Sequence, residues 1–239
     1  TDFPIISDDC FFTDDTVMTV AVAEALIKGG RNEAKTEKEM VKSMKKYGKL
    51  YPDAGYGNRF SEWLSSSEPK PYGSFGNGSA MRVSPVAWFF HSLEKVEKYA
   101  EISAKVSHDH EEGIKGAKAT AAAIFLARNG RTKDYIKRYI ELKYRYDFSK
   151  TLDEIRPTYE FDETCQGTVP VALQVFFEAE SFEDTLRKAI SMGGDSDTLA
   201  AITGAVAEAY YGIPPELIDQ AKTYIPDDLL EIVMELENL

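Results

Sequence analysis

The sequence predicts an all-α protein that forms a single domain over residues 1–239. Apolar side chains recur with helical spacing through most of the chain, and no stretch sustains the alternation of apolar and polar residues that is typical of a strand. Gly, Asn, Ser and Thr stand where these periodic stretches begin and end. Helical folds of this length, 239 residues, usually form one core.

The first half of the chain contains three of the expected helices. Residues 14–28 carry apolar side chains at helical spacing and are followed by a Gly-Gly pair that stops the helix. Residues 36–49 predict a charged helix with a solvated face, and a serine can open a helix over residues 93–107. The Gly- and Pro-rich stretch 68–79 is the longest irregular segment, and such ordered loops are often functional.

The second half adds further helices. Residues 111–128 end before an Asn-Gly pair, and a threonine caps the Tyr-rich helix that follows. Ser181 and Asp184 have the spacing of a capping box, which starts a helix over residues 182–192. The stretch 199–212 carries small side chains on several sides, as expected of a helix that its neighbours approach closely.

Composition and charge exclude several classes of protein. Hydrophobic residues make up 43% and charged residues 28%, which is typical of a globular chain. The net charge of −12 argues against a nucleic-acid partner, since such proteins need a basic face. No stretch approaches the ~18 apolar residues of a membrane span, and no secretory signal is visible. Cys10 and Cys165 lack a CxxC spacing, which favours free thiols in the cytoplasm, with one disulfide as the alternative.

Two aspartate motifs stand at the expected starts of helices. Thr13–Thr16 (TDDT) opens the first helix, and Gly193–Thr198 (GGDSDT) opens a late Ala-rich helix. For each motif alone, helix capping is the simpler explanation, because Asp and Thr at a helix start satisfy free backbone N–H groups and complement the helix dipole. Capping therefore remains open as the alternative to a functional role for either motif.

Taken together, the two motifs predict a metal site if they meet. Adjacent aspartates inside a helix diverge by about 100°, so they can share one focus only at a cap, where the backbone turns away. Two such caps face to face gather carboxylates that repel one another unless cations neutralise them. Hard oxygen ligands suit Mg²⁺, Mn²⁺ or Ca²⁺ rather than zinc. The sequence alone does not show that the two caps meet.

The segment Gly73–Arg82 (GSFGNGSAMR) runs into an expected apolar helix. Glycines let a backbone approach a ligand closely, and the N–H groups at a helix start favour an anion such as a diphosphate. The segment lacks the lysine of a P-loop and the spacing of a dinucleotide-binding fingerprint. An ordinary glycine turn is the alternative.

Four blocks of the sequence resemble the signature blocks of the ADP-ribosylglycohydrolase family. They are FTDDTVMT (12–19), GNGSAMRVSPVAW (76–88), SHDHEEGIKGA (107–117) and GGDSDTLAAITGAVAEAYYG (193–212). The blocks occur in the family's order and span nearly the whole chain. The segments YPDAGYG and CQGTVP are similar to the bacterial branch of that family.

The resemblance implies an orthogonal bundle of helices around a binuclear metal centre with two Mg²⁺ ions, Mn²⁺ being possible in their place. It implies the metal ligands Thr13, Asp14, Asp15, Asp195, Asp197 and Thr198. It further implies that ADP-ribose contacts Gly76, Asn77, Gly78, Ser79 and His108. The candidate catalytic residues are Asp14, Asp15 and Asp195, although the sequence does not divide roles among them.

Two histidines near this expected ligand site have simpler explanations. Without the resemblance, His108 reads as a capping or surface histidine near a helix start. His110 falls where the bacterial branch often carries a second histidine, and we expect an exposed residue there.

The family usually begins with a helix that carries a GDxxGxxxE-like block, which does not occur in this sequence. Its glutamate is a leading candidate for the acid and base at the metals, and Glu24 lies in mid-helix, where it does not suit that role. We expect that the 239 residues are a trimmed version of a longer, more active protein. The alternative is that an aspartate transfers the proton.

The function that the resemblance implies is metal-dependent hydrolysis of the N- or O-glycosidic bond between ADP-ribose and an acceptor. The substrate would be an ADP-ribosylated protein or a small ADP-ribosyl compound, with neither a nucleic acid nor a membrane as partner. Two alternatives remain open: a nucleotide phosphohydrolase that uses the same two metals, and a non-catalytic protein that binds ADP-ribose. The compartment expected from the sequence is the cytoplasm.

Overall fold

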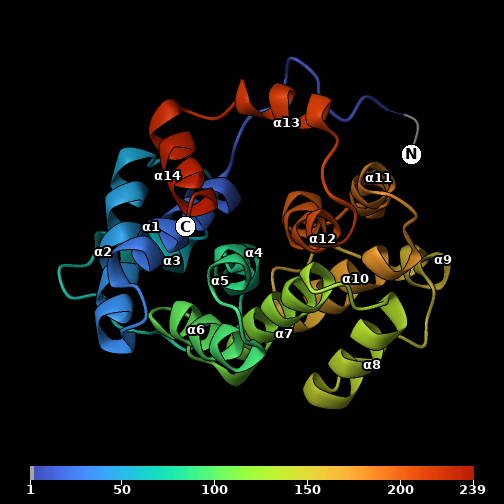
Figure 1. The fold of residues 1–239 in the computed structure, drawn as a ribbon, viewed down its shortest axis with the longest axis horizontal. Coiled ribbons are helices and arrows are strands. Elements are labelled where there is room, and N and C mark those ends of the chain that lie inside the picture. The colour runs from blue at the N-terminus through green and yellow to red at the C-terminus, as the bar shows by residue number, and fades with distance from the viewer. Residues whose placement is uncertain (1–2) are drawn as a thin grey trace.

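Helices are the regular secondary structure of this chain, as the computed structural model of residues 3–239 shows (Figure 1). The described residues contain no strand, only an isolated bridge between Gly76 and Thr164. The all-α prediction is therefore confirmed. In chain order the elements are α1 (Asp14–Gly29), α2 (Glu33–Leu50), α3 (Asn58–Ser65), α4 (Gly78–Met81), α5 (Ser84–Phe89), α6 (Leu93–Lys105), α7 (Glu111–Arg128), α8 (Lys133–Tyr144), α9 (Leu152–Ile155), a 3₁₀ turn (Arg156–Thr158), α10 (Cys165–Glu178), α11 (Phe182–Met192), α12 (Ser196–Tyr211), α13 (Pro215–Lys222) and α14 (Asp227–Glu237).

The helix ends follow local capping chemistry at most of the expected places. Helix α1 ends where Gly30 takes a positive φ of 62°, a conformation that only glycine adopts at little cost. At α11, the Ser181 hydroxyl accepts from the Asp184 N–H at 3.1 Å. The Asp184 carboxylate accepts from the N–H of Glu180 rather than from that of Ser181, so the expected capping box forms only on one side. Ser92 precedes α6 without making a side-chain cap.

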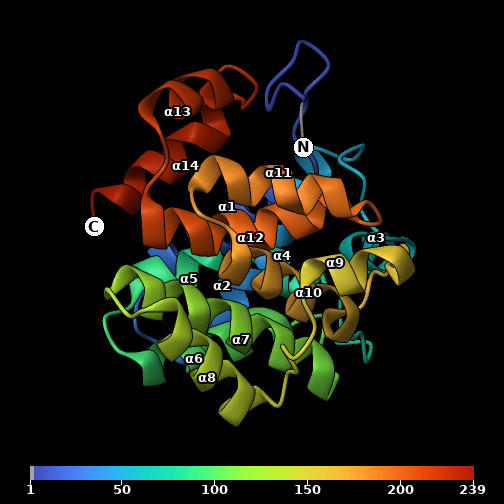
Figure 2. The same ribbon diagram turned by 90° about the vertical axis from the view of Figure 1, so that its right-hand side faces the viewer.

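Helix α7 is the centre of the bundle. It packs against α4, α5, α6, α8, α10 and α12, and most of its residues are buried, many of them alanine. In Figure 1, α4, α11 and α12 are seen nearly end-on, whereas α7 and α10 run across the view. Figure 2, turned by 90°, shows α12 lying above α4 and α10. This steep crossing is the orthogonal arrangement expected, and it brings the starts of α1, α4 and α12 into one region.

One contiguous apolar cluster extends from Val17 in α1 to Leu229 in α14. Small residues let helices approach closely inside it. A Cβ added to Gly29 would lie 2.5 Å from the Thr36 Cα, so α1 and α2 can pack as they do only with glycine there. Helix α1, which carries the first aspartate motif, is thereby held against α2.

The structure also bears on membrane insertion and on the pairing of the two cysteines. No helix within residues 3–239 is long and apolar enough to cross a membrane. Both cysteines are free, with Cys10 exposed and Cys165 buried, so the disulfide alternative is wrong.

Candidate active site

The first aspartate motif forms the start of α1 without acting as an ordinary cap. Thr13 occupies the N-cap position but makes no side-chain cap; its hydroxyl donates to the Asp15 carboxylate at 3.0 Å. The Asp14 N–H donates to the Ala54 carbonyl at 2.8 Å, which ties the start of α1 to the loop after α2. The hydroxyl is therefore committed to Asp15, and the simple capping explanation does not account for Thr13.

Asp15 is buried and Asp14 half-buried, and both carboxylates lie beside other negative charges. Asp15 is 8% exposed, and its Oδ1 has no hydrogen-bond partner among residues 3–239. Burial and the charge of Asp197 raise the pKa of Asp15 to about 7. Burial and the charges of Asp15 and Asp197 raise the pKa of Asp14 to about 7 as well. A buried acceptor without a partner, beside like charges, is the environment that a bound cation would relieve.

The second aspartate motif begins α12 after two glycines with positive φ. At Gly194 the φ is 64°, and a Cβ would come within 3.0 Å of the Tyr159 ring, so the turn requires glycine. The turn presents Asp195, whose Oδ2 accepts from the Asn77 side-chain amide at 2.7 Å. Burial raises the pKa of Asp195 to about 6, against the lowering effect of Asn77.

The two motifs meet. Asp14, Asp195, Asp197 and Thr198 line the same cavity, although 180 positions in the numbering separate Asp15 from Asp195. Within the described residues, no three acidic, histidine or cysteine side chains gather into a ready-made metal cluster. Carboxylates that repel one another spread apart, and a cation is what would draw them together. The donor set, all hard oxygen, together with the unpartnered Asp15 Oδ1, fits Mg²⁺ or Mn²⁺.

The glycine segment connects the second aspartate motif to the rest of the site. The Asn77 N–H donates to the Glu163 carbonyl at 2.7 Å, and the Asn77 side-chain amide bridges Thr168 and Asp195. The helix expected after this segment is only the single turn α4, followed by α5. Pro85 at the start of α5 has no N–H to donate to the Met81 carbonyl four residues earlier, which favours a break between α4 and α5. An anion would therefore meet backbone of the loop and one turn, not the end of a long helix.

Of the residues expected to contact the ligand, His108 lines the cavity and Ser79 does not. The Ser79 hydroxyl donates to the Gly113 carbonyl at 2.8 Å and does not line the cavity. His108 does line it, although its side chain is only 5% exposed. Burial, together with the charges of Arg82 and Arg59, keeps the pKa of His108 well below 6.5, so the ring is neutral. His110 is exposed, as expected, and accepts from the Glu112 N–H as the N-cap of α7.

Glu24 lies away from these groups, in the middle of α1. Its carboxylate accepts from Ser43 at 2.6 Å and pairs with Lys46 at 2.6 Å and Lys28 at 2.9 Å. Burial alone would raise its pKa, but these partners lower it to about 2. Glu24 therefore fastens α1 to α2, which agrees with the expectation that its position does not suit proton transfer.

The main cavity measures about 680 Å³, a volume in the range of small-molecule sites. Two aromatic rings at its lining are exposed, Phe75 at 40% and Phe161 at 65%. Thr13, Asp15 and Ser79 are outside its lining. Some further lining residues lie outside the segments that stood out in the sequence, because each reaches the cavity from a loop or helix end far along the chain: Arg59, Phe161 and Glu163.

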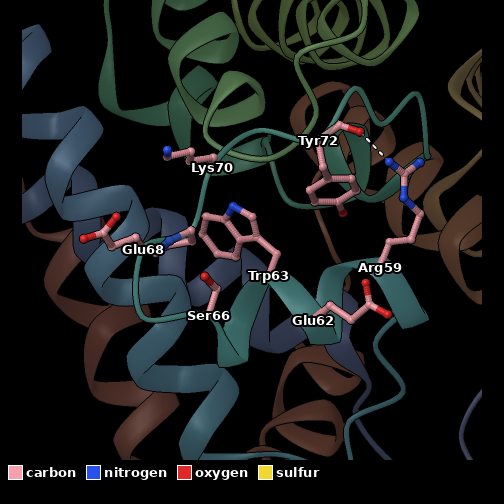
Figure 3. Close-up of a pocket in the computed structure, with 8 residues that line it drawn as sticks. Arg59, Glu62, Trp63, Ser66, Glu68, Lys70 and Tyr72 are labelled. Atoms are coloured by element: carbon pink, nitrogen blue, oxygen red, sulfur yellow. Dashed lines mark hydrogen bonds between the residues drawn. The ribbon is translucent and has the colours of Figure 1, made fainter.

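A second, more open pocket adjoins the main cavity. It measures about 460 Å³ and contains Trp63, Glu68 and Lys70 (Figure 3). Arg59 and Tyr72 line both spaces: the Arg59 guanidinium lies 4.7 Å from the Tyr72 ring centroid and donates to the Tyr72 carbonyl. This pair forms the partition between the two spaces.

A sequence model of the ADP-ribosylglycohydrolase family matches residues 2–239. The chain belongs to the ADP-ribosylglycohydrolase family. The resemblance found in the four sequence blocks is thereby confirmed for nearly the whole chain.

Members of the ADP-ribosylglycohydrolase family with assigned names are similar at low identity. The ADP-ribosylhydrolase ARH3 of Homo sapiens is 29% identical, over 92% of this chain and 77% of ARH3. The ADP-ribosylarginine hydrolase Tri1 of Pseudomonas putida (strain GB-1) is 25% identical, over 87% of this chain and 62% of Tri1. A solved structure described as an ADP-ribosylglycohydrolase-related protein complex superposes with a TM-score of 0.72 at 22% identity, covering 95% of this chain and 81% of that one. That likeness shows the shared fold.

Proposed function

We propose that this chain is a metal-dependent hydrolase that cleaves the glycosidic bond between ADP-ribose and an acceptor. The observation that carries the proposal is the meeting of both aspartate motifs with the glycine segment and His108 around one cavity. The names of the relatives support the same substrate class: one is called an ADP-ribosylhydrolase and another an ADP-ribosylarginine hydrolase. The acceptor is a protein side chain or a small molecule, joined through nitrogen or oxygen.

In this proposal the two aspartate motifs hold two Mg²⁺ ions, with Mn²⁺ as a substitute. The groups that would hold them are Thr13, Asp14, Asp15, Asp195, Asp197 and Thr198. When bound, such ions lower the pKa of water and position sugar hydroxyls. The support is the buried, unpartnered Oδ1 of Asp15 and the mutual repulsion of the carboxylates.

The rest of the cavity suits an ADP-ribosyl group. Backbone at Gly76 and Gly78 is open to the cavity and can approach a diphosphate, while Asn77 holds Asp195 in place. Exposed Phe75 and Phe161 offer flat apolar faces to a base. Cleavage at the distal ribose needs a proton for the leaving group and a base for the water. We assign these proton transfers to Asp14, Asp15 and Asp195, of which Asp14 and Asp195 line the cavity.

The decisive experiment is a turnover assay with identified products. The protein is given peptides ADP-ribosylated on arginine or on serine and small ADP-ribosyl esters, with Mg²⁺ and with a chelator. We expect Mg²⁺-dependent release of free ADP-ribose. Release of phosphate would identify a nucleotide phosphohydrolase, and recovery of intact ligand would identify a binding protein; either result overturns the proposal.

A double variant tests the shared metal site. Asp195→Asn with Asp197→Asn should abolish turnover and the rise in melting temperature on adding Mg²⁺, because binding to the folded state alone stabilises it. The matched control is Asp134→Asn with Asp219→Asn, two exposed aspartates on α8 and α13. The control should keep both properties. A double variant at α12 that binds Mg²⁺ as the parent does would show that the ions lie elsewhere.

A further inference from the structure

A buried chain of hydrogen bonds leads from Arg82 to the ring of His108. Arg82 follows α4 and is 1% exposed. Its guanidinium donates to the Ser103 carbonyl at 2.8 Å and to the Ser107 hydroxyl oxygen at 2.9 Å. The Ser107 oxygen lies 2.8 Å from Nδ1 of His108. No carboxylate of residues 3–239 forms an ion pair with Arg82. Its guanidinium is instead held by the Ser103 carbonyl and the Ser107 hydroxyl.

The proton positions in this chain are set by what each group can do. An arginine can only donate, so the Ser107 oxygen accepts from Arg82. The Ser107 hydroxyl has one proton of its own, and Nδ1 of His108 is the other partner that the described residues offer it. If Nδ1 carried a proton, the buried Ser107 hydroxyl would be left without an acceptor, which is unfavourable for a buried donor. The hydroxyl therefore donates to Nδ1.

The proton of the neutral ring then lies on Nε2, and Nε2 faces the glycine segment. A Cβ added to Gly78 would lie 3.3 Å from Nε2, and one added to Gly76 would lie 3.4 Å from it. Both glycines line the main cavity. Because neither carries a side chain, the Nε2–H is reachable by a ligand that lies along this backbone.

We propose that Arg82 and Ser107 are positioning residues that hold His108 as its Nε2–H tautomer, so that His108 is a fixed hydrogen-bond donor to an oxygen atom of the ligand in the main cavity. A donor recognises phosphate, hydroxyl or carbonyl oxygen and rejects an N–H group presented at the same point. The identity of that ligand as an ADP-ribosyl group rests on the proposed function; the tautomer does not.

The tautomer is read by long-range ¹H–¹⁵N correlation spectra of the imidazole. The chain has three histidines, so His91→Asn with His110→Asn leaves His108 alone, and Asn is also a good N-cap for α7 at position 110. We expect an unprotonated Nδ1 and a protonated Nε2 in the folded protein. Ser107→Ala in this background should give a mixture of tautomers, because Nδ1 loses its donor.

Ser103→Ala is the matched control. Ser103, on α6, is buried like Ser107. It contacts Arg82 through its backbone carbonyl, while its hydroxyl donates to the Ala100 carbonyl. Its loss removes a buried hydroxyl and leaves the chain to His108 intact. The control should keep the Nε2–H tautomer. A protonated Nδ1 in the parent, or an unchanged tautomer in Ser107→Ala, overturns the positioning proposal.

Calorimetry with ADP-ribose tests the consequence for binding. We expect Ser107→Ala to weaken binding in proportion to its lost Nε2–H fraction, about twofold for an equal mixture of tautomers, and Ser103→Ala to leave binding unchanged. Equal affinities for Ser107→Ala and the parent would refute the donor role of His108. A parent that binds no ADP-ribose would refute the proposed function instead, and the spectra would still decide the tautomer.

Discussion

Replacing Asp15 with asparagine should stabilise the metal-free fold while removing its response to Mg²⁺. Asp15 is 8% exposed, its Oδ1 has no partner among residues 3–239, and its pKa is raised from 3.8 to about 7 by burial and by the charge of Asp197. Each unit of pKa corresponds to ~1.4 kcal/mol. Keeping Asp15 ionised inside the fold therefore costs about 4 kcal/mol without a cation.

The sign follows from proton linkage. Between pH 3.8 and about 7 the folded state binds a proton at Asp15 that the unfolded state has released. The free energy of unfolding of the parent therefore falls as the pH rises through this window and stays low above it. Asparagine cannot ionise, and its carbonyl can still accept from the Thr13 hydroxyl, but its N–H groups are left buried, at ~1–3 kcal/mol. The net gain at about pH 8 is ~1–3 kcal/mol.

The assay is denaturant unfolding with a chelator at about pH 5 and pH 8, repeated with millimolar Mg²⁺. The advantage of Asp15→Asn should appear at the higher pH and shrink at the lower. Added Mg²⁺ should stabilise the parent and have much less effect on the variant. Asp219→Asn on α13, which is exposed and outside the cavity lining, should follow the parent throughout. A variant less stable than the parent at about pH 8 with chelator, or one equally stabilised by Mg²⁺, would refute the reasoning.

Three other substitutions test neighbouring features. Gly78→Val should reduce ADP-ribose affinity about tenfold or more in calorimetry with the fold retained, since its Cβ meets only the His108 ring; unchanged affinity would place the ligand elsewhere. Gly29→Ala should lower the free energy of unfolding by ~1–3 kcal/mol, because the added Cβ would collide with backbone. In Gly48→Ala the added Cβ would contact the flexible Leu64 side chain, so the loss should be smaller. Thermal unfolding that ranks the two variants in reverse contradicts this packing. Glu24→Gln should lower the free energy of unfolding by ~1–3 kcal/mol near neutral pH. The difference from the parent should vanish as the pH falls from 4.5 toward 2, where the parent's carboxylate loses its charge. A difference that does not change with pH would show that this charge is not involved.

Much of the secondary structure was predictable because its signals are local. The Gly-Gly pair after residue 28, the Asn-Gly pair after residue 128 and Ser181 each act within one turn of a helix end, and α1, α7 and α11 end or begin there. The glycine segment was predicted less well. Its apolar continuation indicated a helix, but tertiary contacts to the loop before α10 and the proline of α5 divided it into two short pieces.

The candidate site divides in the same way between local and tertiary information. The sequence alone determined which residues bear carboxylates, hydroxyls and glycines, and its motifs identified the family. Only the tertiary structure decided that the starts of α1 and α12 face one cavity, that Asn77 ties Asp195 to Thr168, and that the Ser79 hydroxyl turns away. It also decided that His108 is a buried neutral ring held by Ser107. The physical reason is that caps and periodicity act across a few residues, whereas burial, charge repulsion and side-chain direction depend on which helices pack against α7.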